Sequence, residues 1–262
     1  MVPLLLKYTP PHRVYYEPML GSGVFLLNKP RAPLEVVNDV NGDVVNFFRV
    51  LRDRKGQRLQ ELLRLTPYAR DEREACQLAL LDPGLSDVER ARAFFVMCET
   101  SMWGDTGSGF GFPATCERPP QATFASRVDR LHRAASRLRG VIVENLDFRA
   151  FFGKYQHAGV FCYLDPPYPP SVTRNSGYYA RNEMSDDDHR DLVELLLGRP
   201  GAYMLSGWPT PLYEPLEAAG WERLEVQRNL SAMLIKGGAQ RGQVTECLWL
   251  NPELRRRLRL LV

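Results

Sequence analysis

Short apolar runs and longer amphipathic segments alternate along most of the chain. Helical patterns predict helices over residues 43–65, 89–99, 127–138 and 186–197. The last of these follows Ser185, a good N-cap, and opens with three acidic residues that suit a helix N-terminus. Runs rich in aromatic and β-branched residues, most of them bounded by Gly, Pro, Asn or Asp, predict buried strands at residues 13–17, 34–38, 141–144, 160–164, 202–206, 221–226 and 244–250.

Strands that alternate with helices predict an α/β fold with a mostly parallel sheet covered on both faces. The last two predicted strands are joined by a stretch that contains Lys236-Gly237-Gly238 and has no clear helical pattern. This connection favours an antiparallel hairpin at the end of the sheet.

Residues 66–124 interrupt the alternation, because they hold helical patterns and a Gly-rich loop, Gly104–Pro113, but no convincing strand. A connection of this length is too long for an ordinary crossover. We therefore expect an inserted helical subdomain over 66–124, and a main domain made of residues 1–65 and 125–262. Ligands of open α/β sheets bind beyond the carboxyl ends of the strands, so an insertion after the second strand could hang over that crevice.

Composition limits the class of protein without naming a partner. The chain has 262 residues, of which 44% are apolar, and its 34 basic and 31 acidic residues give a net charge of +3. This balance does not by itself indicate a nucleic-acid partner. The closing run Arg255–Arg259 contains arginines that suit phosphate, although a solvated helix end is the simpler interpretation.

Cysteine and histidine spacing predicts no disulfide framework and no metal site. The five cysteines are scattered without a C-x-x-C pair, and the four histidines form no pair at zinc-finger spacing. No apolar run approaches the roughly 20 residues of a membrane span, and Met1–Leu6 lacks the basic leader of a signal peptide. We therefore expect a soluble cytoplasmic protein with no metal and no membrane partner.

The strongest chemical signal is Asp165-Pro166-Pro167-Tyr168, which directly follows the strand predicted at 160–164. The exocyclic amino group of adenine is a poor nucleophile, because its lone pair is delocalised into the ring. The Asp165 carboxylate and the Pro166 carbonyl could accept its two hydrogens and direct the lone pair at an electrophilic methyl. Consecutive prolines fix φ and hold this carbonyl rigidly, while Tyr168 offers a flat face to a base taken out of the double helix. A plain tight turn is the alternative.

A second signal is the G-x-G turn of Gly21 and Gly23, which follows the strand predicted at 13–17. This arrangement brings the backbone close to a nucleotide-like cofactor, and the absence of a third glycine argues against NAD. Asn38-Asp39 follows the next strand, where an acidic residue commonly hydrogen-bonds ribose hydroxyls. A strand-to-helix turn and an N-cap are the alternatives for these two segments.

Taken together, these segments resemble the Dam-type, or alpha-group, N6-adenine-specific DNA methyltransferases, especially the phage and prophage members. Supporting similarity occurs at 44–52, 205–207 and 245–252, so the resemblance runs from about Pro11 to Pro252. Four motifs occur in the family's order: Glu17-Pro18-Met19-Leu20-Gly21-Ser22-Gly23, Asn38-Asp39-Val40-Asn41, Glu144-Asn145-Leu146-Asp147-Phe148 and Asp165-Pro166-Pro167-Tyr168.

The resemblance implies a Rossmann-like class I methyltransferase sheet, S-adenosyl-L-methionine as cofactor and double-stranded DNA as partner. It implies that 66–124 recognises the target, and we expect phosphate contacts from arginines in or just after this insertion, such as Arg118 and Arg127. Asp165, Pro166, Pro167 and Tyr168 would form the catalytic turn that holds a flipped adenine. By the same resemblance, the cofactor would be bound by Glu17, Pro18, Gly21, Gly23, Asn38, Asp39, Asp147, Phe148 and Asp165.

Two positions depart from the family pattern. Met19 stands where an aromatic residue is usual, so a ring contact with the cofactor is replaced by a flexible thioether. Family members also carry a Gly-Gly-Lys motif upstream of the Glu-Pro segment, whereas Met1–Pro10 contains only Lys7-Tyr8. The expected consequence of the second departure is a lower affinity for the cofactor.

Three functions remain open at this point, each for a monomer or weak dimer. The first is a site-specific adenine methyltransferase on DNA, of the kind found in restriction-modification. The second is an amino-methyltransferase acting on cytosine or on RNA adenine, although Asp165 rather than serine before Pro-Pro-Tyr favours adenine. The third is a non-catalytic DNA-binding relative, which the presence of Asp39 and Asp165 argues against.

Overall fold

A computed structural model describes residues 1–101, 109–111, 119–172, 184–229 and 243–260. The helices are α1 (Val2–Lys7), α2 (Val24–Asn28), α3 (Gly42–Arg52), α4 (Lys55–Leu65), α5 (Arg70–Ala79), α6 (Asp87–Glu99), α7 (Pro120–Arg137), α8 (Phe148–Lys154), α9 (Asp186–Leu197), α10 (Glu214–Ala218) and α11 (Pro252–Arg259), with a 3₁₀ turn η1 (Pro211–Tyr213). The strands are β1 (Val14–Glu17), β2 (Leu34–Asn38), β3 (Ile142–Glu144), β4 (Val160–Leu164), β5 (Ala202–Gly207), β6 (Glu222–Asn229) and β7 (Gln243–Leu250).

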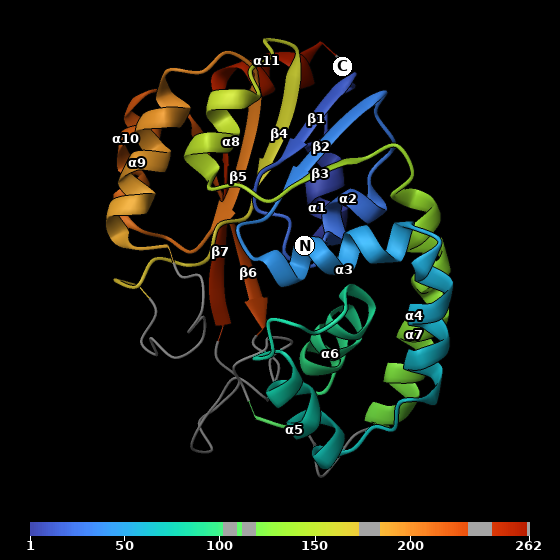
Figure 1. Ribbon diagram of the computed structural model, residues 1–262. Coiled ribbons are helices and arrows are strands. Elements are labelled where there is room, and N and C mark those ends of the chain that lie inside the picture. Colours follow the sequence, from blue (N-terminus) through green and yellow to red (C-terminus); the bar gives the residue numbers. More distant parts are fainter. Residues whose placement is uncertain (102–108, 112–118, 173–183, 230–242, 261–262) are drawn as a thin grey trace. The chain divides into compact units, whose positions relative to one another are not determined.

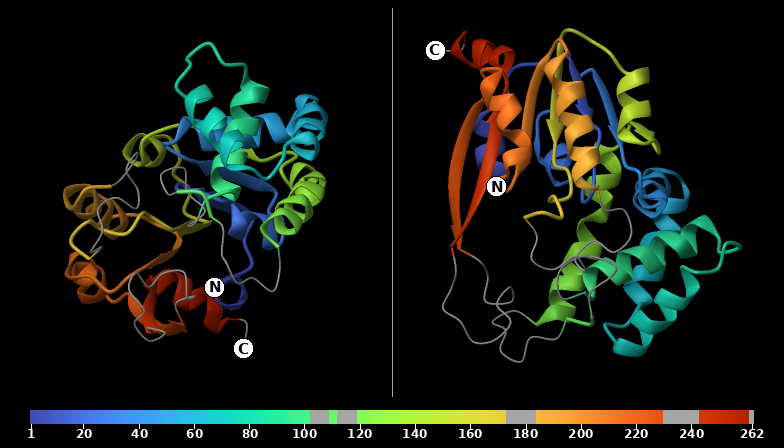
Figure 2. Two further views of the ribbon diagram at one scale, coloured as in Figure 1. Left: turned by 90° about the horizontal axis from the view of Figure 1, so that it is seen from below. Right: turned by 90° about the vertical axis from the view of Figure 1, so that its left-hand side faces the viewer.

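Seven strands form one sheet in the order β3-β2-β1-β4-β5-β7-β6 (Figure 1). β1 pairs in parallel with β2 and β4, and β4 pairs in parallel with β5. β7 is antiparallel to both of its neighbours, and with β6 it forms the long ribbon visible at the side of the sheet in Figure 2. The predicted mostly parallel sheet with an antiparallel end is therefore confirmed. The predicted connecting stretch at Lys236-Gly237-Gly238 lies outside the described residues.

The described chain forms two compact units. The first holds residues 1–40 together with the described residues from 146 onward, and the second holds residues 41–145. The second unit contains α3 to α7 and is broader than the subdomain predicted over 66–124, whose role in target recognition stays a prediction. Most of its predicted Gly-rich loop, and Arg118, lie outside the described residues.

The helix predicted over 43–65 is wrong in one respect, because it is two helices, α3 and α4. The chain leaves helical geometry at Asp53, whose φ and ψ are −83° and 174°, and the Asp53 side chain accepts from the Lys55 backbone N–H. Such local bonding competes with a continuous helix. Gly56 follows at a point where an added Cβ would lie only 2.3 Å from the Leu51 carbonyl oxygen, so the break also requires a glycine.

Alternation along the strands sorts side chains of the first unit onto two sheet faces. One face carries residues such as Tyr16, Cys162 and Trp249, and packs in one cluster with apolar side chains of α8 and α9. The opposite face carries Tyr15 and Phe161, whose rings pack around Phe25 of α2. Figure 1 and Figure 2 show the same layering, with α8, α9 and α10 on one side and α1, α2 and α11 on the other.

The arginines of α11 bind mainly to other groups of the protein itself. Arg257 donates to the carbonyls of Ala158, Gly159 and Val160, at the start of β4. Arg255 pairs with Glu222, and Arg256 pairs with Glu253. This agrees with the simpler interpretation of the Arg255–Arg259 run as a helix end.

At the amino end, α1 buries Leu5 and leaves Lys7 exposed beside the half-buried ring of Tyr8. The described helices include none long and apolar enough to cross a membrane. The described part of the chain also contains no cluster of three His, Cys, Asp or Glu side chains arranged to hold a metal ion.

Candidate active site

The ends of β1, β4 and β5 bring several polar side chains onto the sheet face that α2 covers. Tyr15 and Glu17 alternate with the apolar Val14 and Tyr16, which face the other way. Tyr163 and Ser206 lie on the same face as Glu17, because their neighbours Cys162 and Leu205 belong to the opposite core. Polar groups are thus concentrated where the parallel strands end, the edge at which α/β sheets bind their ligands.

Asp165 begins the turn that follows β4 and is held by its neighbours on this face. Ser206 Oγ donates to Asp165 Oδ1 at 2.6 Å, and the Tyr163 hydroxyl lies 2.9 Å from the same Oγ. Tyr163 and Ser206 are both buried, whereas Asp165 is exposed. A buried relay therefore orients a carboxylate that remains accessible.

The surroundings of Asp165 raise the pKa of its carboxyl group above the usual value. Partial loss of solvation raises its pKa, and the nearby Glu246 carboxylate raises it further, while the hydrogen bonds from Ser206 and Tyr163 lower it. Glu246 lies on β7, which pairs with β5. A carboxylate with a raised pKa is a stronger hydrogen-bond acceptor and base than a fully solvated one.

Glu17, at the end of β1, is a second carboxylate; it is buried, and the charge of Asp165 acts on its pKa. The Tyr15 hydroxyl donates to Glu17 Oε2 at 2.6 Å. Burial raises the pKa of Glu17 to about 8; the hydrogen bond from Tyr15 opposes the rise and the Asp165 charge adds to it. Glu17 is therefore largely protonated at neutral pH.

Below Glu17 on the same face, a buried ion pair stabilises the start of the sheet. Lys29 Nζ lies 2.6 Å from Glu35 Oε1, and both side chains are almost completely buried. The same ammonium donates to the Pro30 carbonyl and lies 4.0 Å from the centre of the Tyr15 ring. These contacts fix the Tyr15 ring, whose hydroxyl in turn holds Glu17.

Tyr168 closes the turn after β4 and is held through its hydroxyl and through one face of its ring. Its hydroxyl donates to Glu246 Oε1 at 3.0 Å, and its ring stacks on Trp208 with 4.5 Å between centroids and 20° between planes. Trp208 comes two residues after Ser206, so the chain at the end of β5 supplies one partner to Asp165 and one to Tyr168. Trp208 therefore supports one face of the ring that the sequence predicts to hold a base.

Asn38 ties together the predicted cofactor loops. Its buried Nδ2 donates to the carbonyls of Pro18 and Leu146, at 2.8 and 2.9 Å, and its Oδ1 accepts from the Leu146 N–H at 2.8 Å. The backbone carbonyl of Asn38 also accepts from Leu20 N–H. All polar atoms of this side chain are thus engaged in holding loops, not in presenting a free group.

The glycine turn lies beside Asp39. Gly21 N–H donates to Asp39 Oδ2 at 2.8 Å, and the backbone of Gly21 and Gly23 has φ of 48° and 62°. These left-handed conformations favour glycine. A Cβ at Gly21 would meet nothing within 4 Å, so the backbone here borders open space.

Asp147 and Phe148 lie at the start of α8. Asp147 is exposed and caps the helix by accepting from Arg149 N–H, while Phe148 is buried with the Arg149 guanidinium 4.3 Å above its ring. Arg149 also binds Asp188 and Asp191 of α9. Asp147 therefore forms an ion pair with Arg149, and this arginine also pairs with two carboxylates of α9.

Most of the predicted residues thus fall into two groups, while Asp147 and Phe148 lie at the start of α8. Asp165 to Tyr168 form one turn with their partners, while Pro18, Gly21, Asn38 and Asp39 are joined by hydrogen bonds. Several residues that contact the turn after β4 or lie close to it were assigned no role from the sequence. For Ser206 the available signal was a polar residue near the end of a central strand, and for His189 a polar residue on an apolar helix face. The residues concerned are Tyr163, His189, Ser206, Trp208 and Glu246.

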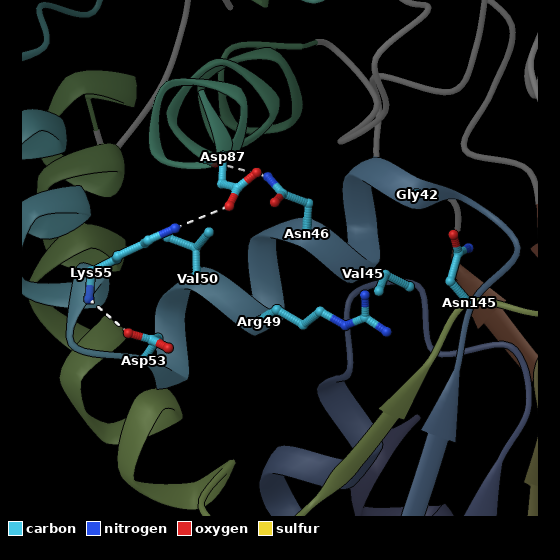
Figure 3. A pocket seen from close by; sticks show the side chains of 9 residues that line it. All are labelled: Gly42, Val45, Asn46, Arg49, Val50, Asp53, Lys55, Asp87 and Asn145. Carbon is cyan, nitrogen blue, oxygen red and sulfur yellow. Dashed lines mark hydrogen bonds and ion pairs between the residues drawn. The ribbon is translucent and has the colours of Figure 1, made fainter. Parts of the chain in front are cut away.

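A hollow of about 240 Å³ lies within the second unit (Figure 3). Arg49 lines it and donates to the Val143 carbonyl. Figure 3 also shows the ion pair between Lys55 and Asp87, and the bond from Asn46 to the Asp87 carbonyl. Because both signs of charge line this hollow, it has no field of one sign that would attract phosphate. In the same unit Arg127, for which we predict a phosphate contact, pairs with Glu99.

Comparison with known proteins gives two matches. Residues 105–204, which include the turn after β4, match the D12 class N6 adenine-specific DNA methyltransferase family. The chain is also 26% identical over 265 residues to the type II methyltransferase M1.LlaDCHI of Lactococcus lactis subsp. cremoris, covering 94% of this chain and 89% of that protein. The predicted phage-like branch stays a prediction. The two matches, together with the sheet order and the Asp165 turn, support adenine-specific DNA methylation as the activity of this chain, and the matched family implies S-adenosylmethionine as methyl donor.

Proposed function

We propose that this enzyme methylates the 6-amino group of an adenine rotated out of double-stranded DNA, at the turn from Asp165 to Tyr168. The observation that carries this proposal is the orientation of Asp165 by Ser206, beside a backbone turn of two prolines. The accessible Asp165 carboxylate and the Pro166 carbonyl form a pair of hydrogen-bond acceptors suited to the two hydrogens of an amino group. As the Lactococcus lactis relative is named a type II methyltransferase, we propose that methylation occurs at a defined sequence.

The predicted cofactor residues fit S-adenosylmethionine on this protein's own geometry. The backbone at Gly21 borders open space and is fixed by Asp39, which suits the approach of a small flexible ligand. In this proposal Gly21, Gly23 and Asp39 contact the cofactor, with Asp39 on the ribose, and Asp147 with Phe148 flank its adenine ring. Glu17, Pro18 and Asn38 hold the loops, because Glu17 and Asn38 are buried and bonded within the protein.

When bound, S-adenosylmethionine supplies the electrophilic methyl group. Asp165 accepts one hydrogen of the adenine amino group and the Pro166 carbonyl accepts the other, which turns the nitrogen lone pair toward the donor. The raised pKa of Asp165 suits it to receive the proton that the amino group releases. The Ser206 hydrogen bond fixes the carboxylate orientation, so little reorganisation is needed during the reaction.

The Tyr168 ring supplies the stacking surface for the extruded base. Trp208 packs against this ring and Glu246 accepts from its hydroxyl, so the ring is fixed in plane and in rotation. Base–aromatic stacking contributes about 1–3 kcal/mol per base. A ring that is already immobile loses less conformational entropy when the base arrives.

Identification of the methylated nucleoside tests the proposal. The purified protein is incubated with methyl-labelled S-adenosylmethionine and either unmethylated duplex DNA or RNA, and the products are digested to nucleosides. The expected result is label in 6-methyladenine from DNA, with Asp165→Ala as the inactive control. Label in 4-methylcytosine or in RNA would refute the substrate, and cofactor binding without any transfer would indicate a non-catalytic DNA-binding protein.

A further inference from the structure

His189 is a fully buried histidine directly behind the turn that carries Asp165. It lies in the first turn of α9, on the same helical face as Leu192, Val193 and Leu196. Apolar side chains otherwise fill this face. A buried imidazole costs free energy unless both ring nitrogens have partners, so its presence here requires an explanation.

One ring nitrogen of His189 has a clear partner. Nδ1 lies 2.8 Å from the hydroxyl of Tyr213, which is itself buried and packs edge-on against Trp249. If the phenol donates this bond, Nδ1 is the acceptor and the single proton of the neutral ring resides on Nε2. Burial lowers the pKa of His189 to about 4, against the opposing charges of Asp186 and Asp188, so the ring is neutral at physiological pH.

The other ring nitrogen lacks such a partner. Nε2 is buried and makes no hydrogen bond of regular geometry to any residue in the described parts of the chain. The carbonyl of Pro167 lies close enough to the ring to raise its pKa. The Nε2 of His189, which has no other partner in the described parts of the chain, and the Pro167 carbonyl are therefore neighbours.

The chemistry of the turn makes this contact valuable. Pro166 and Pro167 have no N–H groups, so neither residue can be fixed by donating a backbone hydrogen bond. The carbonyl side is the remaining means of holding the Pro166-Pro167 peptide. Hydrogen bonds at catalytic sites are often long before substrate is present and shorten in the reactive complex.

We infer that His189 is a positioning residue, whose Nε2–H holds the Pro167 carbonyl and thereby aims the Pro166 carbonyl at the adenine amino group. This inference rests on the proposed function, because it assigns the Pro166 carbonyl a role in the reaction. His189 does not contact the base or the cofactor. Tyr213 acts one step further back, by fixing the tautomer of His189.

Two substitutions at position 189 separate the two nitrogens. His189→Gln places an amide N–H near the position of Nε2 and loses the group at Nδ1. His189→Asn keeps a polar group near Nδ1, within reach of Tyr213, and loses the donor toward Pro167. Both replace an aromatic ring in the core, so a merely structural role predicts similar losses of melting temperature and of activity in the two variants.

Single-turnover methylation of unmethylated duplex DNA at saturating S-adenosylmethionine is the readout, with cofactor Kd measured by calorimetry. We expect His189→Asn to lower the rate about 10- to 100-fold with an unchanged Kd, since small misplacements of reacting groups have effects of this size. We expect His189→Gln to remain within about threefold of the unsubstituted enzyme, the effect of losing one net hydrogen bond to Tyr213. Equal losses in the two variants would overturn the inference.

Tyr213→Phe keeps the inference testable if His189→Asn does not fold. Removal of the phenol hydroxyl frees the imidazole tautomer, and we expect a rate loss of about 3- to 10-fold with the cofactor Kd unchanged. An unchanged rate would contradict the assignment. An unsubstituted enzyme that binds cofactor but methylates nothing would instead refute the proposed function itself.

Discussion

The loops assigned to the cofactor and the turn assigned to the target base are held in different ways. Asn38 joins the cofactor loops through bonds to backbone groups of Pro18 and Leu146, and every polar atom of its side chain is engaged. The turn from Asp165 to Tyr168 is held by side chains from other strands, namely Ser206 and Glu246. The cofactor side is therefore built into the fold, whereas the base side depends on a few separate contacts.

This difference has a mechanistic consequence. Substitutions within the cofactor loops should affect stability and cofactor affinity together, since the same bonds support both. Substitutions around the turn after β4 should affect the rate of transfer while the protein remains folded. The following predictions test this division, beginning with the largest effect.

Asp165→Asn should cause the largest loss. The amide has the size of the carboxylate but lacks its charge and basicity, so the single-turnover rate should fall about 1000-fold. The melting temperature should stay the same or rise, because a carboxylate with a raised pKa is removed. A rate within tenfold of the unsubstituted enzyme would argue against Asp165 as the acceptor, because a tenfold change corresponds to only about 1.4 kcal/mol of activation free energy.

Asn38→Ala should be the most destabilising change on the cofactor side. It leaves the buried backbone groups of Pro18 and Leu146 without partners, which should lower the free energy of unfolding by about 2–4 kcal/mol in denaturant titrations. Asn41→Ala is a matched control, since Asn41 caps α3 by accepting from the Asp43 N–H and loss of such a cap should cost about 1 kcal/mol. Equal effects at the two asparagines would remove the special role given to Asn38.

Glu17→Gln should change how stability depends on pH. The pKa of Glu17 is raised from 4.5 to about 8 in the folded protein, so the folded state retains a proton that the unfolded chain has released. The native enzyme should therefore lose stability as pH rises from about 4.5 to about 8, by on the order of a few kcal/mol from this group. Glu17→Gln should flatten this slope, and parallel curves for the two proteins would show that Glu17 ionises normally.

Tyr168→Phe should have the smallest effect. The ring and its stacking on Trp208 remain while the bond from the hydroxyl to Glu246 is lost, so kcat/KM for DNA should fall about 3- to 10-fold. Glu246→Gln retains an acceptor for the hydroxyl and should be milder than Tyr168→Phe. The reverse order would mean that Glu246 acts through its charge instead of through Tyr168.

Much of this arrangement follows from the sequence, because alternation and strand boundaries depend on local residues. The seven strands and the placement of Asp165 at the end of a central one could be predicted in this way. The break between α3 and α4 was missed, as the effect of Asp53 and Gly56 depends on the packing of the two helices. Glu246 and Trp208 could not be assigned, since the contact of Trp208 with Tyr168 depends on β5 pairing with β4, and that of Glu246 on β7 pairing with β5.

The burial of His189 could have been predicted from the sequence, although it was not. Its spacing of three, four and seven residues from Leu192, Val193 and Leu196 places a polar ring on an apolar helix face. This pattern indicates burial, and a buried histidine needs partners. Which partners it has depends on the position of Tyr213 and of the Pro167 carbonyl, and that is a property of the folded chain.

The division between the two regions is tested most directly by measuring cofactor Kd and saturating transfer rate in both Asp39→Ala and Asp165→Asn. The account predicts that Asp39→Ala raises the Kd for S-adenosylmethionine about tenfold, the worth of a charge-assisted hydrogen bond, with a nearly unchanged saturating rate. It predicts the opposite for Asp165→Asn, with a nearly unchanged Kd and a rate lowered about 1000-fold. If both quantities change together in both variants, the cofactor and base sites are not separable and the account is wrong.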